Sequence, residues 1–167
     1  MRIAPEINLT DEEQIAFTHT LGTFAHEDGE KTADGKDTVY PITMDSAVNP
    51  NADYLKGAFY WHIDGTMSDK PILASIMSAR ALAREGGETD FCNTYAAWEE
   101  LPEARKAQIE GLSAVHALAG AQLAVEPEPS YATFQHWLTV KRNTLPLVWK
   151  HRSGRKSLVI GNTAVGI

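Results

Sequence analysis

Glycine, proline and polar residues divide the apolar residues of this chain into short segments. None of these segments approaches the ~20 uninterrupted apolar residues that a membrane span requires. Short apolar segments bounded by turn residues are typical of strands and brief helices. Several short strands with helices inserted between them predict an α+β domain built around a mostly antiparallel sheet.

Composition excludes several classes of protein. The chain has 167 residues, the usual size of one domain, and 43% of them are hydrophobic, which is too many for a disordered chain. With 15 Lys and Arg against 22 Asp and Glu, the net charge of −7 argues against a nucleic-acid partner. The single cysteine, Cys92, excludes an internal disulfide. Because the first residues also lack a secretory signal pattern, we expect a cytoplasmic protein with no membrane partner.

The clearest helix signal lies near the N-terminus. Thr10 and Glu13 have the spacing of a capping box, in which each side chain bonds to the backbone amide of the other residue. Gly22 is a typical stop signal. The pattern therefore predicts a leading helix that begins at Thr10 and ends at Leu21.

Strand signals follow along the chain. Residues 38–44, 58–66 and 89–92 read as short strands, and Pro41 would place the first of them at a sheet edge or bulge. Residues 72–82 fit a helix by periodicity and a strand by their flanking proline and glycines, so spacing leaves both open. Further along, we expect helices at 94–99 and 103–110, a strand at 112–118, and a β-hairpin over 146–160 that turns at Ser153 and Gly154.

The strongest chemical signal is the pair His62 and Asp64. Residues i and i+2 of a strand point to the same face, so an imidazole nitrogen and a carboxylate oxygen would converge on one point. Two histidines and one carboxylate on one face form a site that suits non-haem Fe(II), and this pair supplies two of those three ligands. The alternative is an ordinary surface pair, because His-x-Asp also occurs by chance.

Several motifs in collinear order strengthen the metal interpretation. They are Trp-His-Ile-Asp-Gly-Thr at 61–66, Gly-Gly-Glu-Thr-Asp-Phe at 86–91, and the segments 9–22, 96–102, 111–116 and 146–156. Together they resemble the TauD/TfdA family of Fe(II)- and 2-oxoglutarate-dependent dioxygenases over residues 9–161.

The resemblance implies an α+β fold with an incomplete double-stranded β-helix core, the jelly-roll or cupin-like arrangement, and inserted helices. It makes residues 72–82 a core strand. Residues 1–167 would form a single partial dioxygenase domain, whose N-terminal strands and C-terminal part we expect to lie outside the chain. Its parts would be a leading helix at 10–22, a core with the metal motif at 38–118, a lid-like variable segment at 120–145 and a β-hairpin at 146–161.

The resemblance also assigns roles to individual residues. His62 and Asp64 match the first two iron ligands, and the third, a histidine, is expected beyond Ile167. Thr89 matches the residue whose hydroxyl contacts a carboxylate of 2-oxoglutarate. Among the other histidines, we expect His116 to be packed or hydrogen-bonded, His151 to have a structural role and His136 to be solvated in a loop. His26 is a candidate for substrate contact. We expect Arg155 to lie on the surface and Cys92 to pack in the sheet.

The implied function is hydroxylation of a small organic anion with release of succinate and CO2. Sulfonates such as taurine, alkyl sulfates and aryloxyalkanoates are the expected substrate types, and the segment 86–93 is closer to the aryloxyalkanoate branch. The implied cofactors are Fe(II) and 2-oxoglutarate, and we expect a homo-oligomer. Two alternatives stay open: a truncated or degenerate family member without activity of its own, and a zinc hydrolase that adds His116, His136 or His151 to His62 and Asp64.

Overall fold

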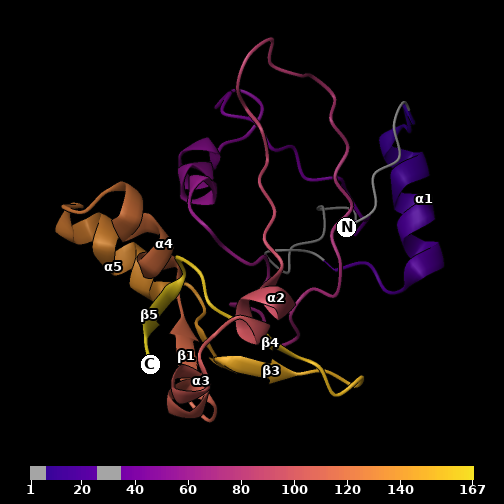
Figure 1. Cartoon of the computed structure of the whole chain (residues 1–167). Helices are drawn as coiled ribbons and strands as arrows, with labels where there is room; N and C mark the ends of the chain where they lie inside the picture. Colours follow the sequence, from indigo (N-terminus) through magenta and orange to yellow (C-terminus); the bar gives the residue numbers. More distant parts are fainter. Residues whose placement is uncertain (1–6, 26–34) are drawn as a thin grey trace. The chain divides into compact units, whose positions relative to one another are not determined.

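The computed structural model, drawn in Figure 1, describes residues 7–25 and 35–167. The chain falls into two compact units. The first unit joins the chain up to Pro41 with residues 72–88. The second unit joins residues 42–71 with residues 89–167 and holds the sheets. Each unit has its own internal contacts.

The first unit is built on helix α1, Asp11–Leu21, and confirms the predicted leading helix. The Thr10 hydroxyl accepts from the Glu13 amide at 3.2 Å, the Glu13 carboxylate accepts from the Thr10 amide at 2.8 Å, and Gly22 caps the other end. Polar contacts tie α1 to the segment 72–88. The buried Gln14 side chain donates to the Ile76 carbonyl at 3.1 Å, and Arg80 pairs with Asp11 at 2.6 Å.

Residues 72–82 form neither the core strand nor the helix that the sequence allowed. They run as an irregular segment in which Leu73 is 99% and Leu82 83% exposed. A strand needs backbone partners along its length, whereas this segment is held by side chains of α1 such as Gln14. The strands predicted at 38–44 and 89–92 are also irregular, and residues 58–66 contain the end of a 3-10 helix, η1 (Ala52–Phe59), instead of a strand.

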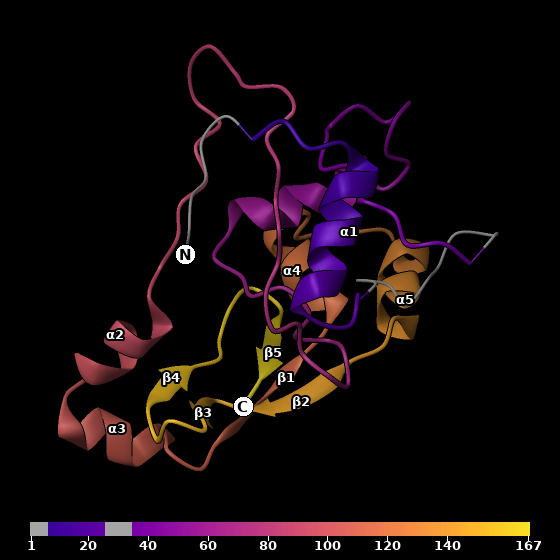
Figure 2. The same ribbon diagram turned by 90° about the vertical axis from the view of Figure 1, so that its right-hand side faces the viewer.

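A three-stranded antiparallel sheet forms the centre of the second unit. Strand β1 (Ser113–His116) lies between β2 (Asn143–Pro146) and β5 (Ala164–Gly166), as Figure 2 shows. Ala114 faces Leu145 across the β1–β2 register, and both are buried. The strand predicted at 112–118 is therefore confirmed as β1, whereas β2 and β5 were not predicted as separate strands.

The predicted hairpin is confirmed as β3 (Val148–Lys150) and β4 (Lys156–Leu158), with Gly154 in the left-handed region at φ 83°. Helix α2, Thr94–Glu99, packs on β4 through the buried Trp98, whose ring lies 5.4 Å from Lys156 Nζ. Helix α3, Glu103–Ile109, follows directly. Both helices match their predicted positions.

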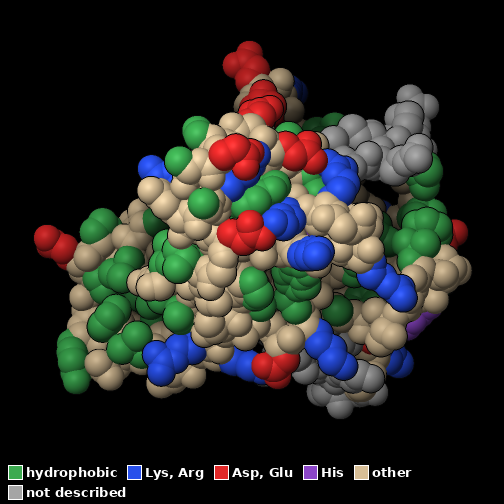
Figure 3. All heavy atoms as spheres, turned by 60° about the horizontal axis from the view of Figure 1, so that its bottom comes forward, with side chains coloured by type: hydrophobic (Ala, Val, Ile, Leu, Met, Phe, Trp, Pro, Cys, Tyr) green, Lys and Arg blue, Asp and Glu red, His purple; other side chains and the backbone are tan. Residues whose placement is uncertain are grey.

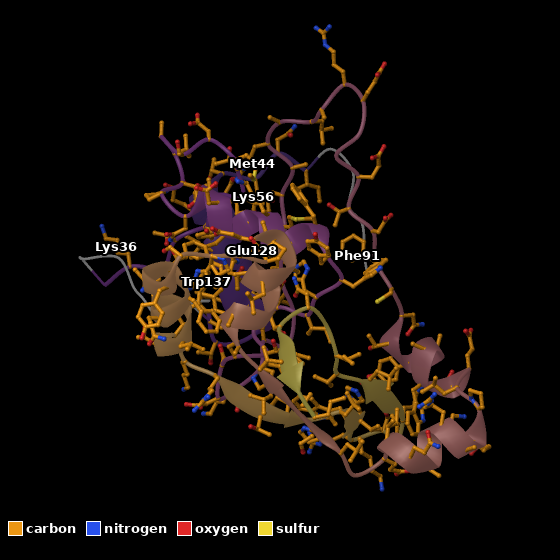
Figure 4. The ribbon with its side chains drawn as sticks, turned by 90° about the vertical axis from the view of Figure 1, so that its left-hand side faces the viewer. Lys36, Met44, Lys56, Phe91, Glu128 and Trp137 are labelled. Atoms are coloured by element: carbon orange, nitrogen blue, oxygen red, sulfur yellow. The ribbon has the colours of Figure 1, made fainter. Side chains whose placement is uncertain are left out.

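Two further helices, α4 (Leu118–Val125) and α5 (Tyr131–Thr139), pack against each other and occupy most of the segment read as variable. Helix α4 also packs on η1, and Trp137 of α5 is 3% exposed (Figure 4). Residues 118–125 are almost entirely small and apolar, so they show no amphipathic period that would reveal a helix.

The observed class is α+β with small antiparallel sheets, as predicted. Within residues 7–25 and 35–167, no helix combines the length and the apolar character needed to cross a bilayer.

Candidate metal centre

The candidate metal pair lies on a turn rather than on a strand. After η1 the chain continues irregularly through His62, and a turn begins at Asp64. Gly65 adopts φ 72°, a conformation that favours glycine, and its carbonyl accepts from the Ser68 amide at 3.1 Å. The prediction that strand alternation brings the two side chains together is therefore wrong, and the turn does so instead.

The two side chains nevertheless converge. His62 Nε2 lies 3.4 Å from Asp64 Oδ1, and the side chains are 35% and 49% exposed. His62 Nδ1 lies 2.8 Å from the Tyr60 carbonyl oxygen. Because a carbonyl only accepts hydrogen bonds, this contact places a proton on Nδ1. In the neutral ring, Nε2 then carries the lone pair on the side of Asp64.

This arrangement fits a divalent metal ion. Two donors at about 2.1 Å from one ion, at angles between 90° and 120°, lie roughly 3.0–3.6 Å apart, a range that contains the observed separation. A ligating histidine usually donates its other N–H to a carbonyl or carboxylate, as His62 does to Tyr60. In the chain as described, no group of three or more His, Cys, Asp or Glu side chains could hold a metal, so His62 and Asp64 form a pair.

The other histidines do not join this pair. His116 is completely buried on β1, its Nδ1 bonds to Thr163 Oγ1 at 2.8 Å, and desolvation lowers its pKa below 6.5. It is packed, as expected. His151 Nε2 bonds to Ser157 Oγ at 2.8 Å and its ring lies against Tyr95, which confirms a structural role. His136 is exposed, on α5 rather than in a loop.

The remaining predicted residues, Thr89, Arg155 and Cys92, are all exposed. Thr89 is exposed in an irregular segment, and no hydrogen bond joins it to His62 or Asp64 among the described residues, so its role stays a prediction. Arg155 lies on the surface, as expected, where it pairs with Glu99 at 2.8 Å. Cys92 is exposed and outside the sheets, so the prediction that it packs is wrong. Phe91, the residue before it in the sequence, lies on the segment that leads into α2 (Figure 4). His26 lies outside the described residues.

A cavity of about 190 Å³ lies elsewhere in the second unit, between α4, α5 and β5. Its lining is mostly apolar and includes Phe134, Trp137 and Val165 but neither His62 nor Asp64. Figure 3 shows hydrophobic side chains gathered on the side of the molecule where α4 and α5 lie. Tyr60 and Trp61, which precede the metal pair in the sequence, are 46% and 60% exposed.

Sequence reasoning missed Asn162 and Thr163, which contact the chain on both sides of the pair. The Asn162 amide donates to the Trp61 carbonyl at 2.9 Å, and Thr163 Oγ1 lies 3.2 Å from Thr66 Oγ1. The available signal was the glycine before them, Gly161, because a glycine outside a clear turn can mark close backbone approach.

Comparison with known proteins places this geometry in context. A family model described as taurine catabolism dioxygenase TauD, TfdA family matches residues 5–167. An alkylsulfatase of Acinetobacter baylyi is 30% identical over 161 residues, covering 93% of this chain and 48% of the relative. An (S)-phenoxypropionate/alpha-ketoglutarate-dioxygenase of Sphingobium herbicidovorans is also 30% identical, covering 99% and 58%.

A solved structure is similar as well. The crystal structure of AAD-2 in complex with Mn(II) and N-oxalylglycine superposes with a TM-score of 0.70 at 25% identity, covering 96% of this chain and 53% of that one. The chain therefore spans about half the length of the relatives it matches.

Proposed function

Because this chain belongs to the TauD, TfdA family, we propose that it supplies the first two iron ligands of an Fe(II)- and 2-oxoglutarate-dependent dioxygenase. The reaction hydroxylates a small organic anion and releases succinate and CO2. The observation that carries the proposal is the geometry of His62, with Nδ1 bonded to the Tyr60 carbonyl and Nε2 3.4 Å from Asp64 Oδ1.

His62 and Asp64 would hold the ion, and the residues around them prepare the pair for it. The Tyr60 carbonyl retains the proton on Nδ1, so that Nε2 presents a lone pair. The carboxylate of Asp64 offsets part of the charge of the cation. When bound, Fe(II) with 2-oxoglutarate and oxygen supplies the oxidant for an unactivated C–H bond. Thr89 would donate its hydroxyl hydrogen to a carboxylate of 2-oxoglutarate.

The proposal includes a third ligand and a fuller fold. We place the third ligand, a histidine, beyond Ile167, and the support is the lack of a third candidate beside His62 and Asp64 in the described ranges. The small antiparallel sheets would belong to a double-stranded β-helix core, which the similarity to AAD-2 supports. Residues 1–167 would be one partial domain, with 120–145 as a lid-like segment.

The substrate class follows from the relatives. Their names refer to alkyl sulfate and phenoxypropionate chemistry, so the proposed substrate is a small anion with an alkyl or aryl group. We also propose a cytoplasmic location, which the exposed free thiol of Cys92 supports, because free thiols persist in reducing compartments. Self-association is part of the proposal, since it would bury exposed apolar residues such as Tyr131 and Leu138.

The test measures oxygen-dependent succinate formation from 2-oxoglutarate after anaerobic addition of Fe(II). Taurine, an alkyl sulfate and an aryloxypropionate serve as candidate substrates, and a longer product of the same locus is assayed beside the 167-residue chain. His62→Ala and Asp64→Ala should abolish turnover, whereas His19→Ala, at an exposed histidine on α1, should leave it unchanged.

The outcomes separate the alternatives. Turnover by the longer product alone would support the reading in which the 167 residues lack activity of their own. An absence of turnover from both proteins would contradict the enzyme proposal.

A further inference from the structure

Three consecutive residues, 161–163, run alongside the segment that carries the metal pair, and we call them the strap. Gly161 passes directly over the backbone of His62. A Cβ built on Gly161 would lie 2.9 Å from His62 Cα and 3.1 Å from the Trp61 carbonyl oxygen. The first distance is shorter than real Cβ contacts allow, so only glycine fits between the strap and the first ligand.

Asn162 fixes the chain on the N-terminal side of the pair. Its backbone amide donates to the Trp61 carbonyl at 2.9 Å, one residue before His62. Its side-chain Nδ2 donates to the Gly57 carbonyl in η1 at 2.7 Å. Two hydrogen bonds from one residue thus hold both the approach to His62 and the helix that precedes it.

Thr163 fixes the chain on the C-terminal side. Its hydroxyl lies 3.2 Å from the hydroxyl of Thr66, two residues after Asp64, and 2.8 Å from Nδ1 of His116 on β1. Thr66 and His116 are 3% and 0% exposed, so both contacts are protected from water. The hydroxyl of Thr163 therefore joins the turn after Asp64 to the central strand of the sheet.

The opposite side of the strap is equally close to its neighbour. The Thr163 carbonyl accepts from the Ala117 amide at 2.9 Å, and a Cβ on Gly120 of α4 would lie 2.8 Å from the carbonyl oxygens of Asn162 and Thr163. The strap is thus confined between the backbone of His62 on one side and α4 on the other.

We propose that the strap positions the metal pair, with Thr163 as its principal positioning residue. This inference rests on the proposed function, because it concerns the same pair. His62 and Asp64 are about one-third and one-half exposed, so core packing fixes their side chains only in part. Their placement depends on the backbone, and the strap holds that backbone at Trp61 and at Thr66. A site of this kind needs its ligands held to within about 0.5 Å.

The test compares Thr163→Val, which keeps the side-chain shape but lacks the hydroxyl, with Thr163→Ser, which restores it. Thr139→Val, at an exposed threonine on α5, is the matched control. The first readout needs no metal: ¹⁵N chemical shifts of the His62 ring report whether the proton stays on Nδ1. The second is the apparent Kd for Mn(II), followed by paramagnetic broadening of the His62 ring signals in the 167-residue chain.

In Thr163→Val we expect the His62 proton to redistribute between the ring nitrogens and Mn(II) affinity to fall about tenfold, the lower end for lost supporting contacts. Thr163→Ser and Thr139→Val should resemble the unaltered chain. If Thr163→Val fails to fold, Thr66→Val is tested instead. This variant removes the other hydroxyl of the 3.2 Å contact.

Unchanged His62 ring shifts in a folded Thr163→Val or Thr66→Val protein would overturn the inference. If the unaltered chain keeps the Nδ1 proton but does not bind Mn(II), the proposed metal function fails, and the ring shifts of the variants still decide the role of the strap.

Discussion

Replacing Gly161 with alanine tests the closest contact of the strap with the metal pair. The added methyl carbon would lie 2.9 Å from His62 Cα, whereas ordinary contacts begin at 3.4 Å, so the two backbones must separate by about 0.5 Å. Both obstructing atoms, His62 Cα and the Trp61 carbonyl oxygen, belong to the backbone and cannot turn away as a flexible side chain would.

The loss in the free energy of unfolding caused by Gly161→Ala can be compared with that of a matched substitution, Gly166→Ala. Overpacking of this kind costs about 1–3 kcal/mol. Any alanine that replaces glycine also stabilises the protein by roughly 0.4–1 kcal/mol through the unfolded chain. Gly166→Ala on β5 shares that second effect, but its methyl group meets nothing within 4 Å. The difference between the two variants therefore isolates the steric term.

Urea denaturation measures this difference. We expect Gly161→Ala to have a free energy of unfolding about 1–3 kcal/mol below that of Gly166→Ala, with similar denaturant slopes. We also expect the His62 ring shifts to change in Gly161→Ala only. Equal stability of the two variants would refute the close approach of the strap to His62.

Three further predictions address other parts of the molecule. Burial lowers the pKa of His116 below its ordinary value of 6.5, so at acidic pH the unfolded chain binds more protons than the folded one. The free energy of unfolding should therefore fall as the pH drops from 6.5 toward the folded-state pKa. In urea titrations at several pH values, His116→Asn should make this dependence on pH weaker. Thr10→Ala should lower the free energy of unfolding by about 1 kcal/mol and reduce the helical circular dichroism signal. Thr10→Ser, which keeps the capping hydroxyl, should leave the stability and the helical signal unchanged. Trp98→Ala should cost about 3–5 kcal/mol in denaturant unfolding, and Phe91→Ala, 62% exposed, less than about 0.5 kcal/mol.

Local signals predicted the elements that local interactions determine. The capping box of Thr10 and Glu13 and the turn at Gly154 each involve residues a few positions apart, and the structure contains both α1 and the hairpin. Residues 72–82 carry a pattern that suits a strand, but a pattern cannot supply the neighbouring strand that a ladder needs. The small apolar residues of α4 form a helix because they pack against η1 and α5, which is a tertiary effect.

The candidate site shows the same division. His62 and Asp64 were identified from their spacing, and their side chains do lie 3.4 Å apart. The predicted cause of this proximity, the alternation of side chains along a strand, is wrong, because a turn at Gly65 replaces the expected strand. The strap could not be predicted, since an Asn and a Thr carry no chemical signal of their own and act through partners distant in sequence.

The contact between Thr66 and Thr163 spans 97 positions in the chain. Closing so long a loop carries an entropic cost that contacts between near neighbours in the chain do not have. During synthesis, residues 62–66 leave the ribosome well before the strap. The turn that carries His62 and Asp64 can therefore make its contact with the strap only once the chain has been synthesised as far as Thr163.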